Sequence, residues 1–169
     1  RDGMEEEEMN NKCGVCETKM KNKRETVPYE CGLDGIVLED IAVYLCPKCG
    51  EREVEVPNTL KLHHEIAMAL ARKAERLGPK EIRFLRKYLG LSSTEFANKV
   101  GVDKATVSRW ERVEEPTSMG GQTERLLRVL VMSERPVESY SLDELAVKAP
   151  KTMRMRFAPQ RSGWRPHAA

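Results

Sequence analysis

Four of the five cysteines stand in two C-x-x-C pairs, and this arrangement limits how the first third of the chain can fold. The pairs are Cys13 with Cys16 and Cys46 with Cys49, and 29 residues (46 − 16 − 1) separate them. Two such pairs can present four thiolates to one metal, and zinc takes four sulfur ligands as a tetrahedron with Zn–S near 2.3 Å. The sequence therefore predicts one structural Zn²⁺ bound by these four cysteines.

Four thiolates leave no open position for a substrate or water, so we expect this metal to stabilise a fold. The Cys-Pro-x-Cys-Gly knuckle also resembles that of rubredoxin, because iron and zinc share this geometry, and an electron carrier is therefore the alternative. We expect Cys31 to be a small buried or half-exposed thiol and not a fifth ligand. His63 and His64 are adjacent on a predicted helix and face different directions, so we expect them at the surface or a boundary.

The residue pattern predicts an α+β chain of two modules. Short runs rich in Val, Ile and Leu between the cysteine pairs favour a small sheet, whereas the second half has helical periodicity. We expect a small zinc-bound β-rich N-terminal domain, a linking helix and an all-α C-terminal domain. The predicted segments are a disordered acidic tail over 1–11, a β domain over 12–56, a connecting helix over 57–78, a helix-turn-helix domain over 79–133, a short helix over 134–149 and a disordered basic tail over 150–169.

The connecting helix has signals at both ends. Asn58 can cap its start, and Gly78 followed by Pro79 predicts its end near Leu77. Its apolar face is expected to include Ala69, together with the aliphatic residues at 62, 66 and 70. The pattern predicts a long helix that connects the two modules.

Charge is distributed unevenly, although the net charge is only +2. Residues 1–12 sum to 2 − 5 = −3, whereas residues 148–169 carry six Lys or Arg and no acid, which gives +6. This separation is a weak indication of a polyanionic partner, with solvated tails as the alternative. No apolar run approaches the roughly 20 residues of a membrane span, and no signal peptide is recognisable. We expect a cytoplasmic protein without a membrane partner, in which C-x-x-C cysteines bind metal.

Residues 91–111 predict a helix-turn-helix. Ser92 or Ser93 can cap a first helix, Gly101 permits a tight turn, and Asp103 can cap the second helix. Trp110 is expected to face the core. In this motif the second helix enters the major groove of DNA with its N-terminal residues first. The sequence therefore predicts double-stranded DNA as a partner.

The outer face of this motif resembles that of repressor-type (XRE/Cro) domains. The predicted DNA-binding residues are Ser93, Thr94, Lys104, Ala105, Thr106, Ser108 and Arg109. Arg109 can bind guanine O6 and N7 with both arms of its guanidinium, whereas Ala105 and the Thr106 methyl can only touch a thymine methyl or a sugar. Ser93 and Thr94 would lie at a phosphate. A helical bundle that binds only protein is the alternative.

The order of these motifs resembles the MqsA (YgiT-type zinc finger) antitoxin family over about residues 12–132. The resemblance rests on the first C-x-x-C pair, Gly32-Leu33-Asp34, Tyr44-Leu45-Cys46-Pro47-Lys48-Cys49-Gly50, Pro57-Asn58, Glu81-Ile82-Arg83-Phe84-Leu85-Arg86 and Val107-Ser108-Arg109-Trp110-Glu111. It implies that the four paired cysteines bind zinc and that the zinc domain silences a toxin, often a ribonuclease. It also implies that a helix-turn-helix homodimer represses its own operon. The best-known member has an asparagine at the position of Ala105, so its operator sequence is not carried over.

These patterns together predict a DNA-binding antitoxin of a type II toxin–antitoxin system, which neutralises a toxin and autorepresses its operon. A zinc-containing transcriptional regulator with no toxin partner is the alternative, and a protein adaptor with a vestigial helix-turn-helix is a third reading. No set of residues resembles a nucleophile with a base and an oxyanion site, so we do not expect an enzyme.

Overall fold

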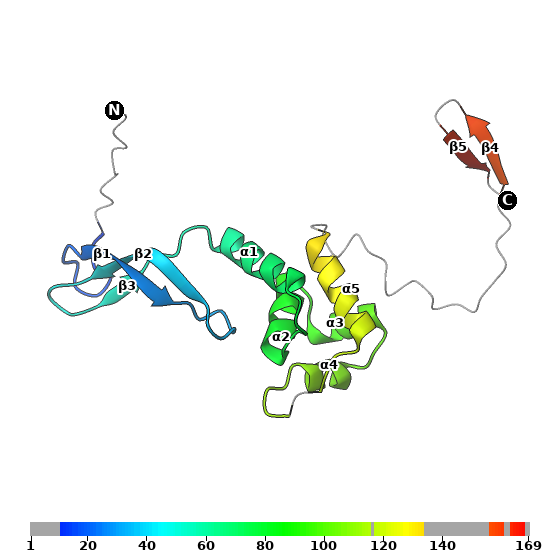
Figure 1. The fold of residues 1–169 in the computed structure, drawn as a ribbon. Coiled ribbons are helices and arrows are strands. Elements are labelled where there is room, and N and C mark those ends of the chain that lie inside the picture. The colour runs from blue at the N-terminus through cyan, green and yellow to red at the C-terminus, as the bar shows by residue number, and fades with distance from the viewer. Residues whose placement is uncertain (1–10, 116, 134–155, 161–162, 168–169) are drawn as a thin grey trace.

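The computed structural model describes residues 11–115, 117–133, 156–160 and 163–167. In these residues three strands are followed by five helices and then by a two-stranded hairpin (Figure 1). Most of the predicted acidic tail and the whole predicted helix over 134–149 lie outside the described residues. Within the described part, no helix is both long enough and apolar enough to cross a membrane.

The N-terminal part is a three-stranded antiparallel sheet of order β1-β2-β3, which confirms the small sheet predicted there. β1 (Lys21–Pro28) pairs with β2 (Val37–Leu45), which pairs with β3 (Arg52–Val54). The register shifts between Glu25 and Val27, opposite Asp40 at φ 56°, which is the behaviour of a β-bulge. Lys21 pairs with Leu45, so the cysteine pairs before β1 and after β2 meet at one end of the sheet.

α1 (Thr59–Arg72) differs from the predicted connecting helix at both ends. Asn58 precedes it in the left-handed conformation, with φ 47° and no side-chain hydrogen bond, so it is not the predicted side-chain cap. The helix also ends at Arg72 and not near Leu77. In a longer helix the Leu77 N–H would bond the carbonyl oxygen of residue 73. Instead this N–H bonds Glu124 at 3.1 Å, and Arg128 donates to the carbonyl oxygens of residues 71, 73 and 75.

The buried face of α1 is also wider than predicted. Ile66, Ala67, Met68 and Ala71 are buried, whereas Ala69, which was predicted on the apolar face, is exposed. The reason is that both α2 (Pro79–Tyr88) and α5 (Gly121–Met132) pack on this helix, so neighbours cover it from two directions.

The remaining helices form a compact bundle with α1. α3 (Ser93–Val100) and α4 (Lys104–Trp110) pack against each other, and α5 returns to cover α1 and α2. Pro79 occupies the first turn of α2, where its missing N–H costs nothing. The centre of the core is fully buried and consists of Ile82, Leu85, Phe96, Ala97, Val107, Leu127 and Val131.

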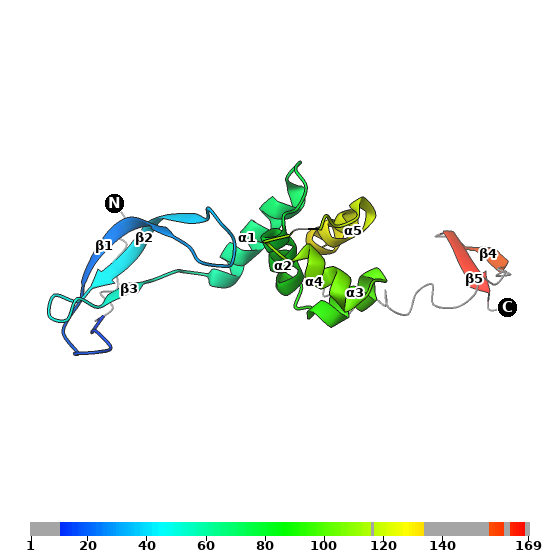
Figure 2. The same cartoon turned by 90° about the horizontal axis from the view of Figure 1, so that it is seen from below.

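The turn between β1 and β2, which we call the hairpin tip (residues 29–36), packs on the helices. Leu33 is 9% exposed and belongs to the same buried cluster as the helical core. The Tyr29 hydroxyl lies 2.9 Å from His63 Nε2, and Lys80 Nζ lies 2.6 Å and 2.7 Å from the two carboxylate oxygens of Asp34. Both views place α1 between the sheet and the other helices (Figures 1 and 2). The division into two modules stays a prediction, because this tip shares the helical core.

The end of the chain departs from the predicted disordered tail over 150–169. β4 (Arg156–Gln160) pairs with β5 (Gly163–His167) as an antiparallel hairpin, so the prediction of disorder is wrong for these ten residues. The prediction relied on the prolines and arginines. The prediction gave too little weight to the strand preference of Phe157 and Trp164, which are aromatic residues and therefore favour paired strands. Phe157 pairs with Pro166 and Pro159 with Trp164.

Candidate metal centre and nucleic-acid interface

The two cysteine pairs have the same backbone geometry. In the first, the Glu17 N–H bonds the Cys13 carbonyl at 2.9 Å and the Cys13 N–H bonds the carbonyl of residue 18 at 3.0 Å. In the second, Gly50 and Cys46 repeat these two bonds at 3.0 Å and 2.8 Å. The residue after the pair is left-handed in both, with φ 56° at Glu17 and φ 76° at Gly50. These turns hold the two sulfurs of each pair on one side of the backbone.

The four sulfurs converge on one point. All four Sγ atoms lie within 4.8 Å of one another, and three of the separations are 3.5 Å for Cys13–Cys49, 3.4 Å for Cys16–Cys46 and 3.6 Å for Cys16–Cys49. A zinc tetrahedron with Zn–S near 2.3 Å requires sulfur atoms about 3.8 Å apart. Cys13 and Cys46 are buried, whereas Cys49 is exposed. The predicted ligand set is thus brought together in a cluster that could bind a metal.

The thiols also shift one another's pKa values. Hydrogen bonds with the side chain and backbone of Thr18 lower the pKa of Cys16 to about 6. The Glu51 N–H acts to lower the pKa of Cys49, but contacts with the Cys46 and Cys13 sulfurs outweigh it and raise that pKa to about 12. Four sulfurs at such short separations would repel one another if all were deprotonated, so the fully ionised set needs a cation between them. A divalent ion fits this donor set, because metal binding deprotonates coordinating thiols.

The other metal-ligating side chains lie apart from this cluster. Cys31 is a half-buried thiol, as predicted, and it lies in the hairpin tip, where it packs against the helical core. His63 and His64 are half-buried on α1, and His64 Nδ1 lies 2.8 Å from the hydroxyl of Tyr88 while His63 meets Tyr29. They therefore occupy the boundary position that the sequence predicted.

The segment predicted to form a helix-turn-helix has the predicted caps. Ser92, the first of the two candidates, accepts a hydrogen bond from the Glu95 N–H at 3.2 Å, and Glu95 bonds back to the Ser92 N–H at 2.7 Å. Gly101 ends α3 in the left-handed conformation, with φ 71°. Asp103 caps α4 by accepting from the Thr106 N–H at 2.8 Å. Val107 and Trp110 are buried, so α4 is held against α3 by its inner face.

The predicted DNA-binding residues lie on the outside of α3 and α4. Ser93 and Thr106 are half-exposed, and Thr94, Lys104, Ala105, Ser108 and Arg109 are exposed. Nothing in the described residues covers this face, and α4 lies at the lower edge of the bundle in Figure 1. The arrangement leaves the N-terminal part of α4 accessible to a large partner.

A chain of hydrogen bonds orders three side chains along this face. The Thr106 hydroxyl donates to Asp103 at 2.7 Å, and the Arg109 guanidinium donates to the Thr106 hydroxyl at 2.6 Å. The bonds from the Thr106 hydroxyl and N–H hold the pKa of Asp103 below its usual value. Asp103 therefore stays ionised near neutral pH, and it holds Arg109 along the helix through Thr106.

A buried ion pair that sequence reasoning missed locks the start of the helical domain to the end of α4. Glu111, 4% exposed, accepts from Arg86 at 2.6 Å and 2.9 Å, and Arg86 also donates to the carbonyl of Leu91 at 2.6 Å. Arg83 adds bonds of 3.3 Å to the carboxylate and 3.0 Å to the carbonyl of Glu111. The sequence offered one hint of this pair: Glu111 directly follows Trp110, which was expected to face the core.

Glu124 in α5 is a second buried acid that was missed. Arg76 donates to it at 2.5 Å, Arg128 at 2.8 Å and the Leu77 N–H at 3.1 Å. Burial acts to raise the pKa of Glu124, but these hydrogen bonds outweigh it and hold that pKa below its usual value of 4.5. This cluster fixes the segment between α1 and α2 against α5.

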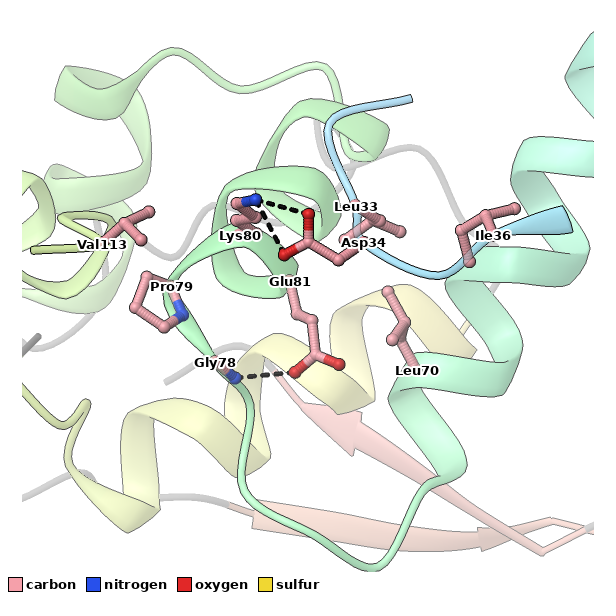
Figure 3. A pocket seen from close by; sticks show the side chains of 9 residues that line it. All are labelled: Leu33, Asp34, Ile36, Leu70, Gly78, Pro79, Lys80, Glu81 and Val113. Carbon is pink, nitrogen blue, oxygen red and sulfur yellow. Dashed lines mark hydrogen bonds and ion pairs between the residues drawn. The ribbon is translucent and has the colours of Figure 1, made fainter. Parts of the chain in front are cut away.

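A cavity of about 390 Å³ lies where the hairpin tip meets the helices (Figure 3). Leu33 and Ile36 of the tip line it together with Leu70 of α1 and Val113 after α4. Its polar groups are already paired, since Lys80 meets Asp34 and Glu81 accepts from the Gly78 N–H at 2.7 Å. The tip is therefore held by Leu33 and by ion pairs, and one side of Leu33 remains loosely packed.

A comparison with known protein families shows the family to which this chain belongs. The family described as the antitoxin component of a bacterial toxin–antitoxin system, MqsA, matches residues 11–136, which is three-quarters of the chain. The chain belongs to the MqsA antitoxin family. A search among curated proteins gave no significant match. The MqsA family match spans both the cysteine cluster and the exposed α4, and it ends before the β4–β5 hairpin.

Proposed function

We propose that this chain is a DNA-binding antitoxin, which neutralises a toxin and represses its own operon as a homodimer. Its membership of the MqsA antitoxin family is the observation that carries the proposal, and it implies a toxin partner. The four-sulfur cluster supports a structural Zn²⁺, and the exposed outer face of α4 supports contact with duplex DNA. The proposed role is regulatory and not catalytic.

In this proposal Arg109 reads a guanine from the major groove. It is exposed, lies in the last turn of the seven-residue α4, and is oriented by Thr106 and Asp103. A bidentate contact from arginine to guanine discriminates against other bases by about 1–3 kcal/mol. Lys104 would occupy a second base-edge position, whereas Ser93 and Thr94 would fix the register at a phosphate.

The DNA part is tested by replacing Arg109 with alanine and measuring binding to the duplex upstream of the chain's own reading frame. We expect a loss of about 1–3 kcal/mol and relaxed preference at one base pair. Arg24→Ala is the matched control, because it removes the same charge from the exposed surface of β1. Equal affinity and equal base preference in the Arg109 variant and the control would refute the assignment.

The toxin part is tested by co-expression with the product of the adjacent gene. We expect the two proteins to co-purify and the growth defect caused by the neighbour alone to disappear. If DNA binding is specific but no neighbour product is toxic or bound, the zinc-containing transcriptional regulator without a toxin partner is the better reading. The exposed outer face of α4 is the observation that supports this second candidate function.

The identity of the metal is tested on the purified protein. We expect a colourless protein with one zinc per chain, because a four-thiolate tetrahedron is a zinc or iron site and the site has no open position. Red, iron-containing protein with a reversible redox response would instead indicate the rubredoxin-like alternative. Replacing Cys46 with serine should abolish the bound metal in either case.

A further inference from the structure

The cavity between the hairpin tip and the helices is lined neither by the metal-cluster cysteines nor by the outer face of α4. Its volume of about 390 Å³ is large for a protein interior, where few empty spaces exceed the size of a water molecule. An apolar cavity of about 150 Å³ already takes up benzene, and ligand pockets begin at about 300 Å³. The cavity therefore has the size of a small-molecule site.

The walls of the cavity are mostly aliphatic and come from separate parts of the chain. Leu33 and Ile36 belong to the hairpin tip, Leu70 lies in α1, Pro79 begins α2, and Val113 follows α4. Ile36 and Val113 lie at opposite ends of the cavity (Figure 3). Val113 is 55% exposed, which leaves its end of the cavity accessible from solvent. A molecule inside would touch the tip and the helices at the same time.

The charged side chains of the lining are already paired. Both carboxylate oxygens of Asp34 accept from Lys80 Nζ, at 2.6 Å and 2.7 Å. Glu81 accepts from Lys73 Nζ at 2.8 Å and 2.7 Å, and from the Gly78 N–H at 2.7 Å. Among the described residues, no buried side-chain nitrogen or oxygen lacks a hydrogen-bond partner. The lining therefore offers no unpaired charge that would select an ionic ligand, whereas an uncharged apolar molecule leaves every pair intact.

The tip is held on the helices by little buried surface. Of its eight residues, all of which the structure describes, Leu33 alone is buried, and Ile36 is half-buried. Both of these side chains border the cavity, as does the half-buried Leu70 of α1. A ligand that fills the cavity therefore adds apolar burial where the tip and the helices are least tightly packed.

We propose that this cavity binds a small uncharged apolar molecule, which holds the hairpin tip against the helices. Such a molecule matches the aliphatic walls and covers the remaining surface of Leu33 and Ile36. Because it binds the folded chain and contacts both parts, it stabilises the packing of the sheet on the helices. The inference does not rest on the proposed function, since it requires neither DNA nor a toxin.

The test uses two fluorescent probes that share one ring system and brighten in apolar surroundings. N-phenyl-1-naphthylamine is uncharged, whereas 1-anilinonaphthalene-8-sulfonate adds a negative charge to the same rings. Each probe is titrated into the full chain and into Val113→Trp, which fills the open end of the cavity. Val129→Trp is the matched control, because Val129 is also 55% exposed but lies on α5 and does not line the cavity. Excitation is set where tryptophan does not absorb.

We expect the uncharged probe to saturate at one molecule per chain and to bind more tightly than its sulfonate. Val113→Trp should weaken its binding by about tenfold or more, because extra atoms do not fit a filled site. Val129→Trp should leave the affinity unchanged. The melting temperature of the natural chain should rise with the concentration of the uncharged probe, since the probe binds the folded state.

A second measurement on the natural chain locates the site without any substitution. In methyl NMR spectra, the uncharged probe should shift the signals of Ile36 and Leu70. The signals of Leu60 should stay in place, because Leu60 lies in the same helix as Leu70 but is 87% exposed and outside the cavity. These spectra decide the question if Val113→Trp does not fold.

Four results would overturn the inference. The first is that the uncharged probe does not saturate the natural chain, and the second is equal affinity in the two folded tryptophan variants or unshifted methyl signals at Ile36 and Leu70. The third is tighter binding of the sulfonate that Lys80→Gln removes, because the ligand would then be an anion. The fourth is self-association, followed by light scattering, that the uncharged probe reverses, which would assign the cavity to a second copy of the chain.

Discussion

Replacing Leu33 with alanine should weaken the helical domain, although Leu33 lies in the turn of the β hairpin. Its side chain is 9% exposed and belongs to the helical core cluster. Truncating a buried leucine costs about 2–5 kcal/mol, with the lower values where the surroundings can relax. Leu33 borders the 390 Å³ cavity, so its neighbours Ile36 and Leu70 have room to move. We therefore expect a loss of about 2 kcal/mol, which lowers Tm by roughly 4–8 °C for a chain of this size.

Because of the same contact, the stability of the helices should depend on the bound metal. The sheet buries few side chains, and the metal would tie its ends together, so metal removal should loosen the hairpin tip. Thermal unfolding is followed through the fluorescence of Trp110 in a Trp164→Phe background, with and without a chelator. Metal removal should lower the unfolding temperature reported by Trp110 in this background. Leu33→Ala should reduce the difference between the unfolding temperatures with and without metal. Leu60→Ala is the control, because Leu60 is 87% exposed and should change stability by under about 0.5 kcal/mol.

The reasoning fails if the Trp110 transition is the same with and without metal when Leu33 is present. It also fails if Leu33→Ala leaves the metal-loaded transition where it was. Either result would mean that the sheet and the helices unfold as independent modules, as the sequence pattern alone predicted.

Three further outcomes follow from the site. Glu17→Gly should tighten metal binding by about 0.5–1 kcal/mol in a chelator competition, because Glu17 is left-handed where the matching turn has Gly50, and Gly50→Ala should weaken it. Glu111→Ala should lower the free energy of unfolding by about 3–5 kcal/mol in urea titrations, because it leaves Arg86 buried without a counter-charge. The depressed pKa of Glu124 contributes stability above pH 4.5 that is lost as the pH falls through the lower folded pKa. The stability gap between the natural chain and Glu124→Gln should therefore narrow below pH 4.5, and a constant gap would contradict this.

Features that depend on near neighbours in the chain were predictable. The C-x-x-C spacing was enough to place four sulfurs within 4.8 Å of one another once a short sheet was expected between them. The caps at Ser92 and Asp103 and the left-handed Gly101 follow from side chains within three residues of the backbone groups they satisfy. The exposed face of α4 follows from the period of its buried residues, Val107 and Trp110.

Partners that are far apart in the sequence were not predictable in this way. The end of α1 depends on Arg128 and Glu124, which take the carbonyl and N–H groups of residues 73 and 77 that a longer helix would have joined. The ion pair of Arg86 with Glu111 crosses 25 residues, and neither residue type is normally buried. Leu33 stands between glycines in a short turn, and no local pattern there predicts its contact with the helical core.

The sequence by itself therefore determined which four cysteines come together, and the caps, the turn and the exposed outer face of α3 and α4, because each is encoded in local spacing and local hydrogen bonds. Only the tertiary structure decided where α1 stops, which acids are buried, and that the hairpin tip enters the helical core. Those outcomes depend on which distant groups compete for the same backbone atoms and the same buried space. That competition is settled only when the sheet and the helices pack together.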